Sequence, residues 1–422
     1  MNKILASCSI LLIWLFSLTW GVAQTEKPFG FHFTSKGQKL ARIPIDVQAN
    51  LVILKVTIDN SDTLQFILDT GVSSTIITDP KIAEKIGFQY VRTVQISGAG
   101  EEEPLEARVS IGHTLRIGDV RAYQQNLVVL TEDVLHLSEF LGVPIHGIFG
   151  YDLFSQFVVT IDFDAKEIFF RDPNHFNPKR MHGTPFPLTV TQTKPFTEAV
   201  ALATDSSDKP QRVRLVIDTG AGHALLLNQK SAPSAVSLPK KTIRSHLGRG
   251  LSGEINGQIG RMHTFRIGPL TIHNMLASFP DSSAFGDKFP TLEQDRQGSL
   301  GGEFLRRFRV TFHYKAGLFY LKPVRARLKE PYEHDMSGME IRIKGEDLKT
   351  VVIHRVIEQS PAYLAGVRSG DEIIFVNNRR MDQITVTELY KLLASKEGKD
   401  IELFLKRDQE VVFAYFQLRR FI

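Results

Sequence analysis

Cysteine is almost missing from this sequence of 422 residues, since Cys8 is the only one. A disulfide framework is therefore excluded, as are a cysteine nucleophile and cysteine metal ligands at later positions. The patterns His-Glu-x-x-His, Gly-x-Ser-x-Gly and the Gly-Lys-Ser/Thr phosphate loop are also absent, and the histidines are scattered. These absences argue against zinc peptidases, nucleophile-elbow hydrolases and P-loop nucleotidases, and we expect no metal and no cofactor.

The excess of positive over negative charge is also small. The chain has 51 Lys and Arg against 46 Asp and Glu, spread along its length, so we expect no nucleic-acid-binding surface. Hydrophobic residues make up 42% and charged residues 23%, which are ordinary shares for a soluble globular protein. A chain of this length suggests two or three domains.

One apolar run stands at the N-terminus. Lys3 precedes the apolar residues 4–20, and the small residues of Gly21-Val22-Ala23 suit signal peptidase. We therefore expect residues 1–23 to be a signal peptide and the protein to be exported, to the periplasm, the cell envelope or the medium. Two alternatives remain, an uncleaved membrane anchor and lipidation at Cys8 within the lipobox-like Leu-Ala-Ser-Cys.

The most informative feature is an internal repeat. An apolar triplet followed by Asp-Thr-Gly occurs at residues 66–71 and again at 215–220. An Arg-Ile-Gly turn recurs at residues 116–118 and 266–268, and the segment 147–171 matches 298–322. Three blocks in the same order, each about 150 residues from its copy, indicate a duplicated half-domain rather than a solenoid of short repeats.

Each half has the pattern of β-structure. Runs rich in Val, Ile, Leu, Phe and Thr are separated by turn residues, at 51–59, 64–68, 127–130, 157–163 and 167–170. The pattern predicts a mainly β, two-lobed unit over residues 28–325, with halves at about 28–175 and 185–325. Short helices are expected at 79–86 and near 152–156.

The two Asp-Thr-Gly loops can supply a pair of carboxyl groups. Each aspartate ends an apolar strand, and Gly71 and Gly220 allow the loops to turn sharply and approach one another. Two carboxyl groups a few ångströms apart cannot both ionise, so Asp69 and Asp218 would share one proton. The ionised form could then activate a water while the protonated form hydrogen-bonds a peptide carbonyl.

These residues resemble the pepsin and retropepsin family of aspartic peptidases across both halves. Asp-Thr-Gly is the catalytic loop of that family, and Gly-Ile-Phe-Gly at 147–150 and Gly-Ser-Leu-Gly at 298–301 resemble its second signature. The resemblance implies that Thr70 and Thr219 interlock beneath the aspartates. The second half departs from the family pattern, because His223 stands where a hydroxyl residue is usual and Ser299 replaces an apolar one.

Glycine-rich turns follow each catalytic loop at matching places, at Gly98-Ala99-Gly100 and Gly248-Arg249-Gly250. The resemblance implies that they are flaps over a substrate, one in each half as in retropepsins. Exposed hairpin turns are the alternative.

The segment 333–420 resembles a small α+β PDZ domain. Ser360-Pro361 predicts the start of a short helix, Gly370-Asp371 turns into a strand, and residues 386–393 fit an amphipathic helix. The resemblance implies a groove for a C-terminal peptide, with its carboxylate-binding loop at Gly338, Met339, Glu340 and Ile341. A purely structural small domain is the alternative.

The sequence thus supports two functions. The first is an exported aspartic endopeptidase of bacterial type that hydrolyses peptide or protein substrates, with a PDZ domain for a substrate or partner peptide. The second is a catalytically weak protein that binds peptides in the cleft and the PDZ groove. Both retained aspartates favour the first.

Overall fold

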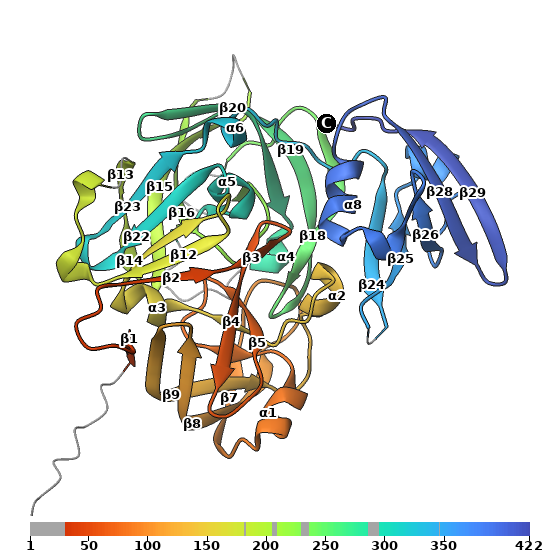
Figure 1. Cartoon of the computed structure of the whole chain (residues 1–422). Coiled ribbons are helices and arrows are strands. Elements are labelled where there is room, and N and C mark those ends of the chain that lie inside the picture. Colours follow the sequence, from red (N-terminus) through yellow and green to blue (C-terminus); the bar gives the residue numbers. More distant parts are fainter. Residues whose placement is uncertain (1–29, 181–182, 205–208, 229–235, 286–294, 346) are drawn as a thin grey trace, which may run out of the picture.

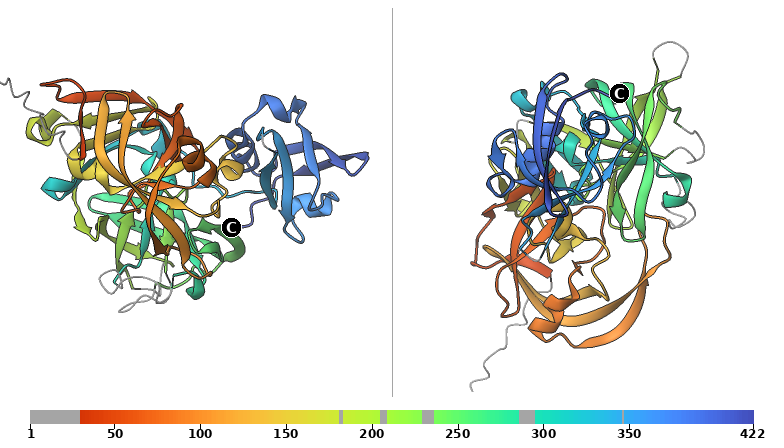
Figure 2. Two further views of the ribbon diagram at one scale, coloured as in Figure 1. Left: turned by 90° about the horizontal axis from the view of Figure 1, so that it is seen from below. Right: turned by 90° about the vertical axis from the view of Figure 1, so that its right-hand side faces the viewer.

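The structure is a computed structural model that describes residues 30–180, 183–204, 209–228, 236–285, 295–345 and 347–422. It is mostly β, with two protease-like halves followed by a β-rich PDZ-like region, which confirms the predicted fold class. The two lobes lie one above the other, and the C-terminal region lies beside them (Figure 1). Figure 2 shows this region projecting from one side of the lobes.

The first lobe is a folded sheet with the strand order β1-β9-β6-β10-β5-β4-β8-β7, and β3 pairs with β4. Its strands are β1 (Gly30–Phe33), β3 (Asp46–Gln48), β4 (Leu51–Ile58), β5 (Leu64–Leu68), β6 (Ile76–Ile77), β7 (Tyr90–Ile96), β8 (Leu105–Ile117), β9 (Val120–Leu130) and β10 (Gly147–Phe149). Its helices are α1 (Pro80–Ile86), α2 (Leu137–Leu141) and α3 (Tyr151–Gln156). The Asp79 carboxylate caps α1 by accepting from the Lys81 amide, and Pro80 takes the first helical position.

The second lobe repeats this plan in the order β14-β15-β16-β21-β17-β20-β19-β18. Its strands are β14 (Thr189–Thr191), β15 (Lys194–Leu202), β16 (Gln211–Ile217), β17 (Leu225–Leu227), β18 (Thr242–Gly250), β19 (Gly253–Ile267), β20 (Leu270–Pro280) and β21 (Gly298–Leu300). Its helices are α4 (Ser282–Phe285) and α5 (Gly302–Leu305). The central order β21-β16-β15-β19-β18 corresponds to β10-β5-β4-β8-β7, so the sequence repeat is a repeat of topology.

A third sheet joins the lobes in the order β13-β23-β22-β11-β12-β2. Its strands are β2 (Leu40–Pro44), β11 (Val158–Asp162), β12 (Glu167–Arg171), β13 (Thr184–Pro187), β22 (Phe308–His313) and β23 (Leu318–Pro323). β11 and β22 run antiparallel, with Thr160 opposite Thr311 and their hydroxyl oxygens 2.9 Å apart. These threonines are equivalent in the two halves, so a pseudo-two-fold axis passes between them.

One apolar core runs through both lobes and the joining sheet. It includes Tyr332, which follows β23 and α6 (Arg325–Leu328) and lies between the limits of 325 and 333 that the sequence suggested for the two domains. Among the described residues, no helix has the length and apolar character needed to span a membrane.

The C-terminal sheet has the order β24-β25-β26-β28-β29, and β27 pairs with β26. Its strands are β24 (Met339–Lys344), β25 (Thr350–Val356), β26 (Glu372–Val376), β27 (Arg379–Arg380), β28 (Asp400–Arg407) and β29 (Glu410–Gln417), with helices α7 (Pro361–Leu364) and α8 (Val386–Leu393). Ser360 caps α7, and Thr385 with Glu388 forms a capping box on α8. This part has its own core, separate from that of the lobes.

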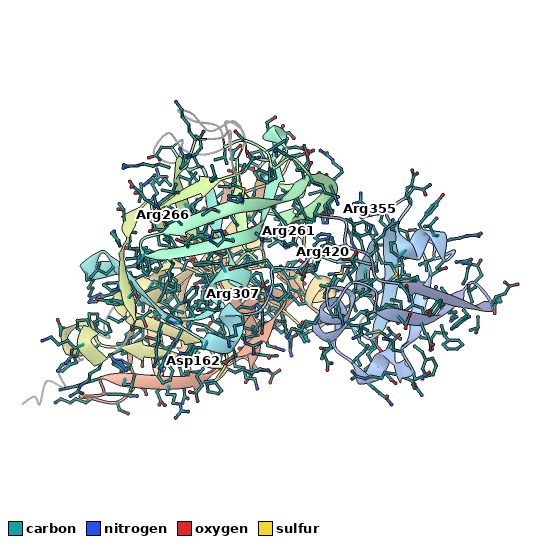
Figure 3. The ribbon with its side chains drawn as sticks, turned by 90° about the horizontal axis from the view of Figure 1, so that it is seen from above. Asp162, Arg261, Arg266, Arg307, Arg355 and Arg420 are labelled. Atoms are coloured by element: carbon teal, nitrogen blue, oxygen red, sulfur yellow. The ribbon has the colours of Figure 1, made fainter. Side chains whose placement is uncertain are left out.

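Glu333 stands where the lobes and the C-terminal part meet. Its carboxylate accepts from Arg261 of β19 at 2.8 Å and from Arg420 near the chain end at 2.5 Å. The two arginines lie side by side at this junction (Figure 3).

Candidate active site

Asp69 and Asp218 stand at equivalent places in the two lobes. Asp69 follows the buried strand β5, which runs parallel to β10, and its amide donates to the carbonyl of Phe149 at 2.7 Å. Asp218 follows β16, which runs parallel to β21, and its amide donates to Leu300 at 2.8 Å. The second signature at 147–150 and 298–301 therefore lies beside each aspartate and fixes the backbone there.

Thr70 and Thr219 cross over between the loops. The Thr70 amide donates to the hydroxyl oxygen of Thr219, and the Thr219 amide donates to that of Thr70, both at 3.0 Å. Each hydroxyl then donates to the opposite strand, Thr70 to Ile217 at 2.5 Å and Thr219 to Leu68 at 2.8 Å. Both side chains are buried, so four polar groups depend on these two hydroxyls.

We expect Thr70→Val to lower the free energy of unfolding by about 3 kcal/mol, because valine keeps the shape but leaves a buried amide and a buried carbonyl unpaired. Urea denaturation followed by circular dichroism measures this. Thr197→Val is the matched control, since Thr197 is buried and donates only to the carbonyl of Pro187; about 1 kcal/mol is expected there. Equal losses in the two variants would contradict the crossed arrangement.

Gly71 and Gly220 allow the two carboxyl groups to meet. A Cβ on Gly220 would lie 2.1 Å from Cγ of Asp69, and one on Gly71 would lie 2.9 Å from Oδ1 of Asp69 and 3.6 Å from Oδ1 of Asp218. Each loop also binds its own carboxyl group, because the Gly71 amide donates to Asp69 at 2.5 Å and the Gly220 amide to Asp218 at 3.0 Å. Neither glycine tolerates a side chain without displacing the carboxyl groups.

The environment favours a proton on this pair. Removal from water and the neighbouring carboxyl of Asp218 raise the pKa of Asp69 to about 8, against the opposing effects of the Gly71 amide and Lys194. At neutral pH the pair therefore holds a proton while one carboxylate remains charged.

His223 and Ser299, the two departures from the family pattern, contact each other. The Nε2 atom of His223 lies 2.9 Å from the hydroxyl oxygen of Ser299. Burial lowers the pKa of His223, although the carboxyl of Asp218 acts in the opposite direction. A neutral imidazole paired with a serine thus occupies the place where the first lobe has Ser74 and Ile148.

The glycine-rich turns lie at the tips of two hairpins that meet. The Ser252 amide donates to the carbonyl of Ala99 at 3.0 Å, and the Gly98 amide donates to the Ser252 hydroxyl at 3.2 Å. A Cβ on Gly100 or Gly250 would collide with backbone of the opposite tip. In the second lobe the predicted turn residues Gly248, Arg249 and Gly250 belong to β18, so the turn itself lies at 251–252. The register of β18 shifts between His246 and Gly248.

The hairpin tips also lie close to the first aspartate loop. Val72, three residues beyond Asp69, packs in one apolar cluster with Ile96 of the first hairpin and Leu251 of the second. The tips therefore lie near the first aspartate loop and contact each other.

The predicted PDZ residues lie away from this site. Gly338 has a positive φ of 79° in the loop before β24, and Met339 and Ile341 turn their side chains into the core of the C-terminal part. Glu340 forms an ion pair with Arg355.

Another polar constellation was not apparent from the sequence, because Asp59, just after β4, is more than 50 residues from Ser110 and His113 on β8. His113 bonds to Ser110 through Nε2 and to Asp59 through Nδ1, both at 2.7 Å. Although the order resembles a serine-hydrolase triad, Ser110 is only 1% exposed and its hydroxyl also lies 2.7 Å from the carbonyl of Gln89. A substrate could not reach it, and the set fastens a strand bulge. Among the described residues, no cluster of acidic, histidine or cysteine side chains could hold a metal.

Two lobes related by a pseudo-two-fold axis, with an Asp-Thr-Gly loop of each meeting at that axis, are the architecture of the pepsin-like and retropepsin-like aspartic proteases. Comparison with family models agrees: an aspartyl protease model matches residues 54–153 and 205–304, and a PDZ domain model matches residues 352–407. The chain thus has two aspartyl protease regions, one in each lobe, followed by a PDZ domain. No curated protein matches the chain significantly.

Proposed function

We propose that the protein is an aspartic endopeptidase in which Asp69 and Asp218 activate a water against a peptide bond. The observation that carries this proposal is the meeting of the two carboxyl groups, with the pKa of Asp69 raised to about 8. The charged carboxylate takes a proton from the water, and the protonated carboxyl donates to the carbonyl oxygen of the substrate. The carboxyl group that took the proton from the water then passes it to the leaving amine. The pair thus returns to one charged and one protonated carboxyl group.

The flaps support an extended peptide as substrate. Their tips meet through backbone hydrogen bonds near the first aspartate loop, so a substrate must part them and can take over those bonds. The test is to incubate the purified protein with a mixed peptide library and to identify products by mass spectrometry. A chain that retains the library in pull-down but yields no products would instead be the peptide-binding protein that the sequence left as the alternative.

The pH dependence of cleavage should follow the shared proton. Because the pair needs one proton, we expect kcat to fall as pH rises through about 8, the pKa of Asp69. The same proton favours the folded chain, which holds it up to about pH 8, whereas the unfolded chain loses it near 3.8. Its contribution to stability is complete below pH 3.8 and disappears by about pH 8. Steady-state cleavage across pH measures the first effect, and a kcat unchanged well above that pH would contradict the shared proton.

We further propose export, on the basis of the N-terminal pattern in residues 1–23, which lie outside the described residues. The mature chain should begin at Gln24. N-terminal sequencing of protein from the native host checks this, and an intact Met1 would contradict it.

A further inference from the structure

The groove of the PDZ domain lies between β24 and α8. β24 is an edge strand, paired on one side with β25, so its other edge is the place where an added peptide strand would bind. However, Tyr390 of α8 donates its hydroxyl to the carbonyl of Ile341 at 3.3 Å. One of the backbone acceptors on this edge is therefore already bonded within the domain.

The loop before β24 is bonded internally as well. The Asp335 carboxylate accepts from the amides of Ser337 at 3.2 Å and Gly338 at 2.6 Å. The amide of Met339 donates to the Ser337 hydroxyl at 3.1 Å. Three consecutive amides at the predicted carboxylate-binding loop thus have partners from their own chain.

The first lobe places α2 and the turn after it against this groove. α2 lies against β24, and a Cβ on Gly142 would lie 2.6 Å from Ile343 of β24 and 3.2 Å from Val386 of α8. The turn therefore touches both walls of the groove. The ring centroid of Phe140 lies 6.5 Å from that of Tyr390, and the Ala49 amide donates to Thr387 of α8 at 3.3 Å.

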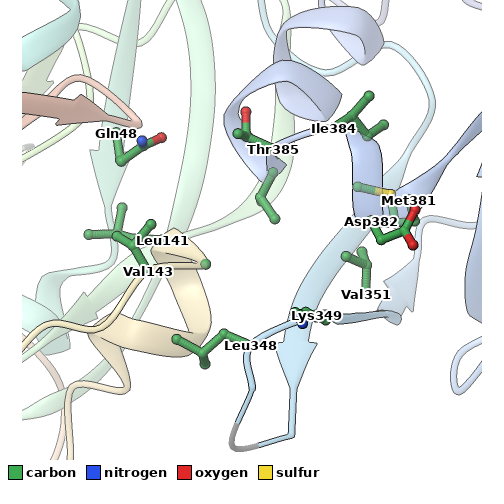
Figure 4. A pocket seen from close by; sticks show the side chains of 12 residues that line it. Gln48, Leu141, Val143, Leu348, Lys349, Val351, Met381, Asp382, Ile384 and Thr385 are labelled. Carbon is green, nitrogen blue, oxygen red and sulfur yellow. The ribbon is translucent and has the colours of Figure 1, made fainter.

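A cavity of about 160 Å³ continues along the same contact, between Gln48, Leu141 and Val143 on one side and Val351, Met381 and Ile384 on the other. Figure 4 shows these side chains facing each other across the junction. The contact between the lobe and the PDZ domain is therefore a continuous face that includes the groove.

The same β24 strand also reaches the second flap. Arg342 donates to Glu254, at the base of the flap tip, at 3.4 Å. Glu254 pairs with Arg249 across the hairpin at 2.7 Å, and Arg249 donates to the carbonyl of Val134, just before α2. Although burial opposes it, His246 and these two arginines hold the pKa of Glu254 below its usual value, so it is charged at neutral pH.

We propose that the PDZ groove holds the chain's own segment 137–143 as an internal ligand, and that this docking latches the second flap in its closed position. The domain then acts as a regulator of the flaps and not as a receptor for a free peptide terminus. Undocking the segment breaks the link from β24 to the flap, because Arg342 and Arg249 then no longer both contact the Glu254 carboxylate. This step rests on the proposed function, in which the flaps control entry of a peptide. The latch then sets how often the flaps part to admit one.

The chain offers a closely matched pair of variants for the test. Gly142 ends α2 with φ 69°, and Gly87 ends α1 with φ 85°. Asparagine is tolerated in this left-handed conformation, so Gly142→Asn and Gly87→Asn both retain the helix end. A Cβ at Gly87 meets no atom within 4 Å, whereas one at Gly142 enters the groove.

Hydrogen–deuterium exchange of the full-length protein reads the docking directly and needs no catalysis, so its failure is distinguishable from failure of the proposed function. We expect Gly142→Asn to speed amide exchange about tenfold in residues 134–143 and in the flap residues 246–254. Gly87→Asn should change neither segment. Arg342→Gln, which leaves the groove intact, should speed exchange in the flap alone.

Unchanged exchange around residue 142 in Gly142→Asn would overturn the internal ligand. Two results together would overturn the latch. They are faster exchange around residue 142 in Gly142→Asn, and unchanged exchange of the flap in both Gly142→Asn and Arg342→Gln. Equal effects of Gly87→Asn and Gly142→Asn would overturn both, since they would reflect a general loss of stability.

Discussion

Asp69→Asn and Asp218→Asn are each expected to lower the rate of peptide cleavage by at least about 10³-fold while the chain stays folded. An amide cannot take the proton of the water, and an Asn–Asp pair cannot share a proton as two carboxyl groups do. Because both positions belong to one unit, the two variants should be about equally inactive. Steady-state cleavage of one peptide identified from the library measures the loss.

Asp62→Asn is the control, because Asp62 is an exposed carboxylate of the same lobe that pairs only with the exposed Lys85. It should cleave at the wild-type rate. Circular dichroism should show all three variants folded, and Asp69→Asn should be more stable than wild type above about pH 8, where the wild-type pair carries two charges. Substantial cleavage by either folded active-site variant would exclude the carboxylate mechanism.

Arg307→Met is expected to lower the free energy of unfolding by about 3–5 kcal/mol. Arg307 is only 1% exposed, and its guanidinium lies 3.6 Å from the ring centroid of Tyr332. It donates to the Glu303 carboxylate at 2.7 Å and to three backbone carbonyls of the segment 327–331. Methionine fills the space but removes the donor to the three carbonyls, while the Glu303 carboxylate keeps its bonds from Arg306. The segment that leads to the PDZ domain should therefore also loosen.

Arg309→Met provides the comparison, since Arg309 lies in β22 two residues beyond Arg307. Arg309 is 31% exposed and pairs with Asp162 at 3.6 Å, so its replacement should cost less than about 1 kcal/mol. Chemical denaturation of both variants measures the difference. Similar stabilities for the two would show that the buried guanidinium is not needed to fasten this segment.

The sequence was sufficient for the fold class, because the evidence lay in local patterns repeated at one spacing. The apolar triplets, the Asp-Thr-Gly loops and the glycine signatures each occur twice, and repetition distinguishes them from chance turns. The helix at Val386–Leu393 was equally readable, since its period and its cap are both local. The roles of Asp69 and Asp218 in catalysis stay predictions, although the structure brings their carboxyl groups together.

Contacts between distant segments could not be predicted in the same way. His223 and Ser299 looked like two separate departures, and only the fold shows that one side chain bonds to the other. The groove of the PDZ domain gave a similar result. Its loop residues suggested capture of a peptide carboxylate, but Asp335 and the turn at Gly142 reach it from outside the motif. No local pattern encodes which surface will cover a groove.

The join at Thr160 and Thr311 has a consequence for how this molecule can diversify. In a symmetric dimer of identical chains, every substitution appears on both sides of the axis. Here a single chain carries both halves, so a change on one side of the cleft leaves the other side as it was. The His223–Ser299 pair, which has no counterpart in the first lobe, shows this freedom in use. The two ends of the peptide substrate that we propose would therefore meet different chemistry, and selection could adjust one end without disturbing recognition of the other.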